Sequence, residues 1–587
     1  MLNLLLKAKR YMPLIFVIIV LLFIIAMCDL LLPRFMANLI NDGINNGNTD
    51  LILRVGLQMI GISLFAVICN IVSGYYLSVA SMGFGRDLRS EAFYKITHFS
   101  MQQTDQFGTS SLITRTSSDV REMQSLLQSG LNAVISVPLH MIGGIVMALS
   151  MDIMLAWIII AAMPVLIIII MINILWVRPL FVTMREKLDS VSRVLREVLS
   201  GVRVIRAFNT TEAENERFNQ TNLAYTKANK TSRYRMALLN PVTTIVTSGA
   251  TIAVYWFGQF RIEAGAMSAG DIMAFSQYVM QILGSVLGLQ MIFNLIPSAM
   301  VASKRLNEVL ATSPSLTDPE NPQTPPAGVY GEVRFENVTF RYPGAEIPVL
   351  ENITFEVKPG ETTAIIGGTG SGKSTLVSLI PRLYDIQGGK ILVNRTDITK
   401  MTQHDLRRRI GFITQKAQLF TGNIADNIRF GNSEIPDDEV NSAASVAQAD
   451  EFIDEMKDGY SSFVSQNASN LSGGQKQRLS IARAIAIKPE IYIFDDSFSA
   501  VDFTTEGKLR AALKTVTQKA AVIIVAQRVS TIMDADRIIV LDSGKCVGQG
   551  KHEDLMKGCE VYREIVYSQL SESEIPSESE ARRGSHE

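Results

Sequence analysis

The feature that most constrains the fold is a series of long apolar runs in the first half of the chain. The first run covers residues 11–33, close to the roughly 20 residues that a helix needs to span a bilayer. It is longer than the apolar core of a signal peptide, so we interpret it as a retained membrane helix. Altogether the runs predict six membrane-spanning helices, near residues 11–33, 51–81, 131–150, 155–177, 237–257 and 272–297.

Composition agrees with a membrane protein. Hydrophobic residues make up 47% of the chain and charged residues only 19%, below the roughly 25% that is usual in soluble domains. The formal net charge is −1, so nothing in the charge balance indicates a nucleic-acid partner. The lipid bilayer is therefore the first partner that the sequence predicts.

Basic residues in the loops predict the orientation of the chain. Residues 82–130 and 178–235 are rich in Lys and Arg, whereas the alternate loops hold little beyond Arg34 and Arg261. Because basic loops stay on the cytoplasmic side, we expect both termini in the cytoplasm. The two basic loops are long and have a helical pattern, so the membrane helices should continue well beyond the bilayer.

A change of composition divides the chain. Residues 313–331 read SPSLTDPENPQTPPAGVYG, a proline-rich stretch without periodicity, and short apolar strands alternating with helical segments follow it. This pattern indicates an α/β domain after a linker. We expect a transmembrane domain at 1–311, a linker at 312–331, a nucleotide-binding domain at 332–570 and a polar, disordered tail at 571–587.

The α/β part contains a phosphate-binding loop. Residues 367–374 read GGTGSGKS, directly after the apolar pair Ile365-Ile366, and fit the pattern G-x-x-x-x-G-K-[ST]. The glycines let backbone N–H groups surround phosphate oxygens. Lys373 would reach the terminal phosphates and the Ser374 hydroxyl would bind Mg²⁺. A chance glycine-rich turn and a dinucleotide-binding loop are the alternatives, but the latter has no use for Lys-Ser at this place.

A second element supports a nucleotide site. The apolar run at residues 491–494 ends in Asp495. A carboxylate at the carboxyl end of a central parallel strand can hold Mg²⁺ beside the phosphates. The two elements together predict ATP and Mg²⁺ as the ligands of this domain.

A third motif resembles that of a known family. Leu471, Ser472, Gly473, Gly474 and Gln475 read LSGGQ, between the phosphate loop and Asp495, and this resembles the signature of ABC transporters. The resemblance extends over nearly the whole chain, and six helices ahead of one nucleotide domain is similar to the layout of exporters. It implies a membrane α-helical domain plus an α/β P-loop nucleotide-binding domain. It also implies a place in the bacterial cytoplasmic (inner) membrane.

The resemblance also assigns roles to residues. Tyr342 would stack on adenine, Gln415 would sense Mg²⁺ and the γ-phosphate, and Asp502 would belong to the D-loop. Residues 106–113 and 208–218 are the expected coupling segments. In this family the signature serves the ATP of the partner, so the chain must dimerise. The ATP-binding set is then Tyr342, Gly367, Thr369, Gly370, Ser371, Gly372, Lys373, Ser374, Thr375 and Gln415, with Ser374, Gln415 and Asp495 at the metal.

The sequence departs from the family at the two positions closest to the chemistry. Asp496 stands where a catalytic Glu is usual, and Gln527 stands where a His is usual. Asp is shorter by one methylene, on the order of 1 Å, and such a displacement can cost about 10²-fold in rate. Gln can donate a hydrogen bond to a phosphate but cannot carry a positive charge. Gln466 also replaces a usual Glu before the signature.

The intact signature beside these departures resembles the degenerate-site subunit of heterodimeric bacterial multidrug exporters. We therefore expect a partner with the usual Glu and His, and export of amphiphilic compounds, drugs first. A homodimeric exporter or lipid flippase with slow turnover is one alternative, and a nucleotide-gated regulatory or channel subunit is another. Asp29 is acidic within the first apolar run. It is either an intramembrane cation site or a residue that pairs locally, and the second interpretation is favoured.

Overall fold

The computed structural model describes residues 2–569, apart from the side chains of residues 2–3 and 289–294. The tail expected at 571–587 lies outside the described residues. By their internal contacts the residues fall into two units. The first holds Met1–Thr97 and Gly108–Ser313, and the second holds His98–Phe107 together with the chain from Pro314 onward.

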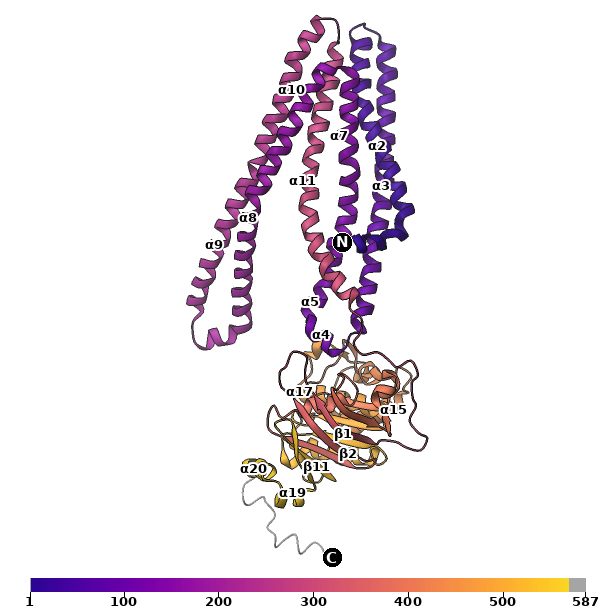
Figure 1. Cartoon of the computed structure of the whole chain (residues 1–587), viewed down its shortest axis with the longest axis vertical. Coiled ribbons are helices and arrows are strands. Elements are labelled where there is room, and N and C mark those ends of the chain that lie inside the picture. The colour runs from indigo at the N-terminus through magenta and orange to yellow at the C-terminus, as the bar shows by residue number, and fades with distance from the viewer. Residues whose placement is uncertain (1, 570–587) are drawn as a thin grey trace, which may run out of the picture. The chain divides into compact units, whose positions relative to one another are not determined.

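The first unit is entirely helical (Figure 1). Between its long helices lie short helices and single 3₁₀ or π turns. The α-helices are α1 (Leu2–Leu6), α2 (Met12–Asn38), α3 (Thr49–Thr97), α5 (Thr109–Thr114), α6 (Val120–Ser125), α7 (Leu131–Met151), α8 (Ile153–Ala207), α9 (Thr211–Ala237), α10 (Leu239–Glu263) and α11 (Ala269–Ala311).

Five helical stretches among the described residues are long and apolar enough to cross a membrane: Leu4–Ile44, Thr49–Thr97, Thr109–Met151, Ile153–Ser200 and Thr211–Glu263. They coincide with the first five apolar runs of the sequence. The sixth run falls in α11, where the side chains of residues 289–294 are not described. That α11 crosses the membrane therefore stays a prediction.

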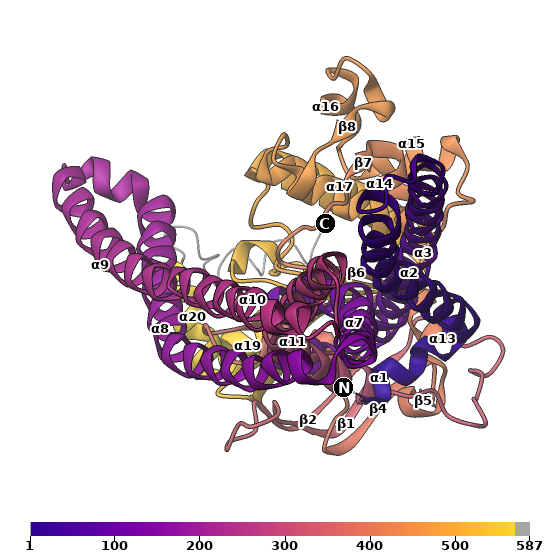
Figure 2. The same cartoon turned by 90° about the horizontal axis from the view of Figure 1, so that it is seen from above.

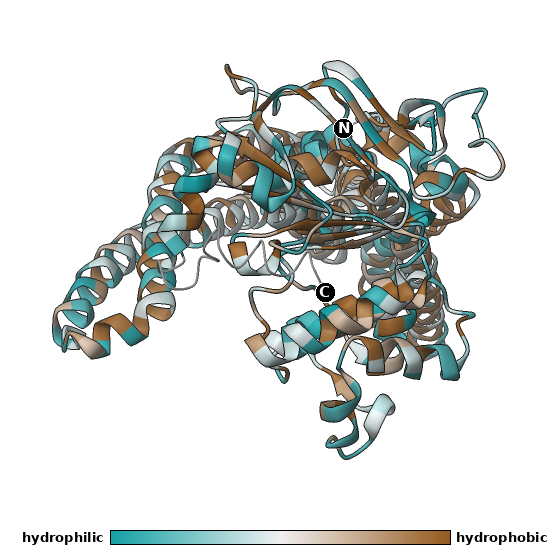
Figure 3. Ribbon diagram, turned by 90° about the horizontal axis from the view of Figure 1, so that it is seen from below, coloured by the Kyte–Doolittle hydropathy of each residue, from teal (hydrophilic) through white to brown (hydrophobic). Residues whose placement is uncertain are grey.

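The long helices exceed the thickness of a bilayer. Helix α8 has 55 residues, which at 1.5 Å per residue is far longer than a hydrocarbon core of about 30 Å. Helices α8 and α9 run side by side as an antiparallel hairpin (Figure 2). In the ribbon coloured by hydropathy, many segments toward the end of this hairpin are hydrophilic (Figure 3), as expected for helices that continue into water.

Two polar pairs join helices of this unit. His140 Nε2 of α7 lies 3.2 Å from Asp29 Oδ2 of α2, so Asp29 has a local partner. Asp152, only 4% exposed at its side chain, lies 2.7 Å from Arg261 Nη2 at the end of α10. Asp152 also accepts a hydrogen bond from the Leu155 amide and thereby caps α8. Asp152 thus faces a guanidinium group and Asp29 faces an imidazole ring. A carboxylate among apolar helices needs a partner of this kind.

The second unit contains three β-sheets. A four-stranded sheet has the order β2-β1-β4-β5, a six-stranded sheet has the order β12-β11-β3-β10-β9-β6, and β7 pairs with β8. The six-stranded sheet is parallel except for β12. The strands are β1 (Val333–Phe340), β2 (Leu350–Val357), β3 (Thr362–Gly367), β4 (Gly388–Val393), β5 (Thr396–Asp397), β6 (Ile410–Ile413), β7 (Gly422–Asn423), β8 (Phe463–Val464), β9 (Ile491–Asp495), β10 (Ala521–Val525), β11 (Arg537–Asp542) and β12 (Lys545–Gly550).

Helices surround these sheets and complete the core of the unit. They are α4 (Met101–Phe107), α12 (Lys373–Leu379), α13 (Gln403–Arg408), α14 (Ile424–Ile428), α15 (Asp437–Val446), α16 (Asp450–Asp454), α17 (Gly473–Ala486), α18 (Phe503–Val516), α19 (His552–Gly558) and α20 (Glu560–Gln569).

The parallel strands are buried on both faces. In β3, Ile365 belongs to the core shared with α12 and the four-stranded sheet. Its neighbours Ala364 and Ile366 belong to the core on the other face, which α15, α17, α18 and α20 complete. Because successive side chains of a strand point to opposite faces, a continuous apolar run is what such a strand needs. This arrangement places the carboxyl ends of β3 and β9 at one edge, where the nucleotide motifs begin.

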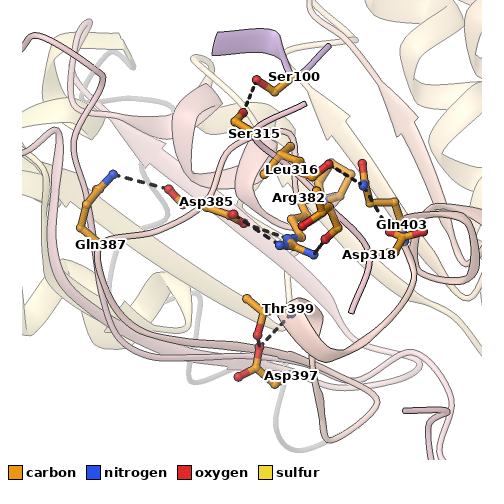
Figure 4. Close-up of polar contacts among 12 residues, drawn as sticks. Ser100, Ser315, Leu316, Asp318, Arg382, Asp385, Gln387, Asp397, Thr399 and Gln403 are labelled. Carbon is orange, nitrogen blue, oxygen red and sulfur yellow. Dashed lines mark hydrogen bonds and ion pairs between the residues drawn. The ribbon is translucent and has the colours of Figure 1, made fainter. Parts of the chain in front are cut away.

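From Pro314 onward the linker belongs to the second unit and is bonded to other segments of that unit (Figure 4). Leu316 is buried, its carbonyl accepts from Gln403 Nε2 at 3.3 Å, and Asp318 Oδ1 accepts from the Gln403 amide at 2.9 Å. The Ser315 hydroxyl donates to Ser100 Oγ at 2.8 Å. The linker is therefore anchored where it enters the nucleotide-binding part of the chain.

Candidate functional site

The phosphate loop joins β3 to α12. Gly370 and Gly372 have φ angles of +83° and +96°, which side chains rarely adopt. A Cβ at Gly367 would lie 2.1 Å from the Leu541 carbonyl oxygen. Backbone angles at Gly370 and Gly372, and the close Leu541 carbonyl at Gly367, thus favour glycine at these three positions of the motif.

The loop offers polar groups suited to phosphate. The Ser371 hydroxyl is buried and has no hydrogen-bond partner among the residues that the structure describes, which normally costs stability. Lys373 Nζ donates to the carbonyls of Gly367 and Gly368 at 2.7 and 2.8 Å, so its ammonium group lies over the loop. Burial lowers the pKa of Lys373, while Asp496 and Asp495 oppose this shift. An orphaned hydroxyl and an ammonium group over a glycine cradle fit a polyphosphate.

A pair of oxygen ligands lies beside the loop. The Ser374 hydroxyl donates to Asp495 Oδ1 at 2.8 Å, and Asp495 is the last residue of β9. Burial raises the pKa of Asp495, and the Ser374 hydrogen bond opposes this rise. Hydroxyl and carboxylate oxygens are the hard donors that Mg²⁺ takes together with substrate phosphates. The residues present therefore fit Mg²⁺ bound jointly with a nucleotide.

Three of the predicted residues meet at one carboxylate oxygen. Asp496 Oδ2 accepts from Gln527 Nε2 at 2.9 Å and from Gln415 Nε2 at 3.2 Å. Asp496 is nearly buried and has a φ of +49°, a left-handed conformation that is uncommon for a residue with a side chain. Burial raises the pKa of Asp496, and the Gln415 hydrogen bond is the largest influence that lowers it.

Gln415 differs in its hydrogen-bond partner from Ser374 and Asp495, the other two residues expected at the metal. Its side-chain amide donates to Asp496, whereas Ser374 and Asp495 bond to each other. That Gln415 also binds the metal stays a prediction.

Tyr342 lies in a cluster of aromatic rings. Its ring meets Tyr384 edge to face at a centroid distance of 5.4 Å and Phe340 at 4.9 Å. Its hydroxyl is 3.0 Å from Thr375 Oγ1, just after the phosphate loop. This places the expected adenine-stacking ring close to the start of α12.

The aromatic cluster also contacts α4. The Tyr384 hydroxyl donates to Asp105 Oδ2 at 3.2 Å, and burial raises the pKa of Tyr384 to about 12. The segment grouped with the nucleotide unit, His98–Phe107, begins earlier than the expected coupling segment at 106–113. The two share only Gln106 and Phe107. The second expected segment, 208–218, spans the turn between α8 and α9, and its contact with a nucleotide domain stays a prediction.

The signature residues form the start of α17. Ser472 Oγ accepts from the Gln475 amide, and Gln475 Oε1 accepts from the Ser472 amide at 2.9 Å. This capping box satisfies two amides at the helix terminus. A Cβ at Gly474 would lie 3.1 Å from the Ala500 carbonyl oxygen. Asp502 caps α18 by accepting from the Thr505 amide, and this hydrogen bond lowers its pKa.

One contact of the site had no signal in the sequence. Gln569, at the end of α20, bonds to the backbone at Gln527 and Val529. Its partners are far away along the chain, and no motif marks it.

A parallel nucleotide-binding sheet with a phosphate loop, a strand ending in Asp495 and an LSGGQ helix, fused to a set of long apolar helices, defines a membrane protein driven by ATP. Comparison with known proteins gives the family. Residues 15–286 match the ABC transporter transmembrane region, and residues 350–499 match the ABC transporter model. The chain belongs to the ABC transporter family.

Individual relatives agree with this assignment. An uncharacterized ABC transporter ATP-binding protein of Mycobacterium tuberculosis (strain CDC 1551 / Oshkosh) is 41% identical over 564 residues, covering 96% of this chain and 97% of the relative. A fatty acid ABC transporter ATP-binding/permease protein of the same strain is 32% identical, covering 82% of this chain and 75% of that protein.

The fold is similar to that of a bacterial Atm1-family ABC exporter solved with ATP bound. The TM-score is 0.79 at 24% identity, and the match covers 96% of this chain and 99% of the other. The fused arrangement of a helical membrane domain ahead of an α/β nucleotide-binding domain, expected from the sequence, is thereby confirmed.

Proposed function

We propose that this chain is the degenerate-site subunit of a heterodimeric ABC exporter that moves amphiphilic compounds, drugs first, out across the bacterial inner membrane. It binds ATP with Mg²⁺ at its own weakly hydrolytic site. Its LSGGQ completes the hydrolytic site of a second half-transporter that carries the usual Glu and His. Closure of the two nucleotide domains on ATP opens the membrane cavity outward, and hydrolysis at the competent site resets it.

The observation that carries this proposal is the bonding of Asp496. Its carboxylate is shorter than that of Glu by one methylene, and one of its oxygens already accepts from both Gln527 and Gln415. Gln527 donates one of its two side-chain N–H groups to Asp496 and has no positive charge to offer. A carboxylate held back in this way is badly placed to orient an attacking water, and a loss of about 10²-fold follows from such displacement.

The capping box at the signature supports the proposal that this chain completes the hydrolytic site of its partner. Ser472 and Gln475 form a complete capping box, so the start of α17 is preorganised although the neighbouring catalytic positions are degenerate. A regulatory subunit that only binds ATP has no need of this helix start. The observation therefore favours an active exporter over a nucleotide-gated channel.

A lipid substrate is the second candidate. One relative is named as a fatty acid ABC transporter, and fatty acids share with many drugs the amphiphilic character expected of the cargo. A lipid flippase with slow turnover, working as a homodimer, remains the alternative on that ground.

The test is ATP turnover by the purified chain in lipid, beside the double variant Asp496→Glu with Gln527→His. We expect the natural chain to be nearly inactive and the double variant to gain about 10²-fold. The matched control is Asp554→Glu, which also lengthens an acidic side chain but at an exposed position of α19, and it should gain nothing. Brisk turnover by the natural chain would instead establish a self-sufficient homodimer.

A further inference from the structure

The last helix of the described chain ends beside the loop that carries Gln527. Gln569 is its final residue. The Val529 amide donates to Gln569 Oε1 at 2.9 Å, and Gln569 Nε2 donates to the Gln527 carbonyl at 2.8 Å. A single side-chain amide thus bonds to the backbone on both sides of Arg528.

The loop that Gln569 contacts is held on its other side by α18. Thr531 Oγ1 donates to Glu506 Oε1 at 2.9 Å, and Arg510 Nη1 donates to the Ser530 carbonyl at 3.5 Å. Residues 527–531 therefore lie between α18, which Asp502 of the D-loop caps, and α20. The Gln569 side chain bonds to the Gln527 carbonyl and the Val529 amide, and the Gln527 side chain bonds separately to Asp496.

Helix α20 does not need Gln569 in order to pack. Tyr562 and Val566 are fully buried against the core of the sheet, and the Tyr562 hydroxyl lies 2.7 Å from His552 Nδ1. Gln569 is exposed on the last turn, where water could serve its amide equally well. Since burial of apolar side chains fixes the helix, the paired bonds of Gln569 act on the loop.

Gln527 links the loop that Gln569 contacts to Asp496. The Gln527 carbonyl is bonded to Gln569, and the Gln527 side chain donates to Asp496 Oδ2. A backbone fixed at residues 527 and 529 limits the directions in which the Gln527 amide can point. Without that restraint the amide loses a defined position at the place of the terminal phosphate.

We propose that Gln569 is a positioning residue that holds the Gln527 loop so that this site distinguishes ATP from ADP. The inference rests on the proposed function, in which this site binds ATP with Mg²⁺, and adds that the second N–H of the Gln527 side-chain amide donates to the γ-phosphate. It assigns to the C-terminal helix of this chain a part in nucleotide selection.

The test compares ATP and ADP affinity of the full chain in lipid, with Mg²⁺ present, by competition against a fluorescent nucleotide. For Gln569→Met, which keeps the length but neither hydrogen bond, we expect ATP affinity to fall about three- to ten-fold while ADP affinity is unchanged. Gln569→Glu retains the acceptor for Val529 and should give a smaller loss. Ser568→Ala, whose hydroxyl bonds only within its own helix, is the matched control and should change neither affinity.

Truncated chains distinguish an effect of the Gln569 side chain from an effect of the residues after it. A chain ending at Gln569 should keep the natural ratio of ATP to ADP affinity, and a chain ending at Ser568 should lose it. The thermal midpoint of Gln569→Met should stay within about 2 °C of the natural chain, since surface changes have small effects on stability. Equal losses for ATP and ADP would mean a merely structural role and would overturn the proposal.

Gln527→Ala distinguishes the role of Gln527 at the γ-phosphate from the positioning role of Gln569. If it changes the ratio and Gln569→Met does not, the positioning role is wrong and the proposed function stands. If neither variant changes the ratio, Gln527 does not serve the γ-phosphate and the positioning role fails, whereas the proposed function is judged by ATP turnover of the Asp496→Glu, Gln527→His variant.

Discussion

At the scale of single residues, the nucleotide site combines strict and altered positions. The glycines of the phosphate loop are fixed by backbone geometry, because Gly370 and Gly372 have positive φ angles. Ser374 and Asp495 bond directly to each other and fit Mg²⁺ in the usual way. The altered residues, Asp496 and Gln527, instead bond to each other. The phosphate loop and Asp495 thus keep the residue types expected for binding, whereas Asp496 and Gln527 stand at the positions that we expect to act on water.

Gly372→Ala should abolish most ATP binding. The residue has a φ of +96°, and its new Cβ would lie 2.8 Å from Leu350 Cδ2 and 3.2 Å from the Val349 carbonyl oxygen. We expect ATP affinity to fall at least about ten-fold, because relieving these contacts moves the phosphate loop. Gly507→Ala, in the open middle of α18, is the control and should leave nucleotide binding unchanged. Natural affinity in Gly372→Ala would show that the loop tolerates the side chain.

Ser374→Ala should remove the dependence of ATP binding on Mg²⁺. The variant loses the hydroxyl that bonds to Asp495 and that supplies a metal ligand. Equilibrium ATP binding measured with Mg²⁺ and with EDTA should differ strongly for the natural chain and little for the variant. Ser378→Ala, whose hydroxyl bonds to the Thr375 carbonyl within α12, should behave as the natural chain. A persistent Mg²⁺ effect in Ser374→Ala would place the metal elsewhere.

At the scale of elements, helix starts and helix ends carry the functional residues. Helix α12 begins at the phosphate loop, α17 at the signature and α18 at Asp502, while α20 ends on the Gln527 loop. The short helix α4, though it belongs to the first third of the chain, packs with the nucleotide unit through Asp105 and Tyr384.

Ser472→Ala should lower turnover of the assembled pair without lowering ATP occupancy of this chain's own site. The hydroxyl caps α17 and, in the proposed dimer, faces the partner's ATP. Removing a donor of this kind costs about 10²-fold in rate. Thr402→Ala removes the comparable cap of α13, with a similar stability cost of about 1 kcal/mol, and should leave turnover intact. Equal turnover in both variants would contradict the role of the signature.

At the scale of the whole molecule, a helical unit and a nucleotide-binding unit share one chain. Residues His98–Phe107 lie between helices of the first unit in sequence but group with the second unit by their contacts. Long helices such as α8 carry the chain well beyond a bilayer. The family relationship extends over both units, since relatives match almost the full length.

The orientation can be checked with a tag at the C-terminus. The excess of Lys and Arg in loops 82–130 and 178–235 predicts that both termini face the cytoplasm. Protease added to inverted membrane vesicles should therefore remove the tag, and protease added to right-side-out cells should not. A matching tag at the N-terminus should give the same pattern. Cleavage in intact cells would reverse the predicted topology.

The sequence by itself determined the features that are local. Apolar runs of sufficient length must become helices in a bilayer, because no other structure satisfies the backbone there, and five of the six expected runs appear as helices of that kind. The phosphate loop, the signature and the strand ending in Asp495 are contiguous, so their residue types suffice to identify them. The family and the fused fold followed from these motifs.

Only the tertiary structure decided the contacts between distant segments. It placed Gln415 and Gln527 on the same oxygen of Asp496, put Gln569 on the Gln527 loop and gave Asp29 a partner in His140. It also grouped His98–Phe107 with the nucleotide unit, a segment that shares only Gln106 and Phe107 with the expected coupling segment 106–113. Such pairings depend on how buried faces bring separate elements together, and a hydrophobic pattern states which face is buried but not which element covers it.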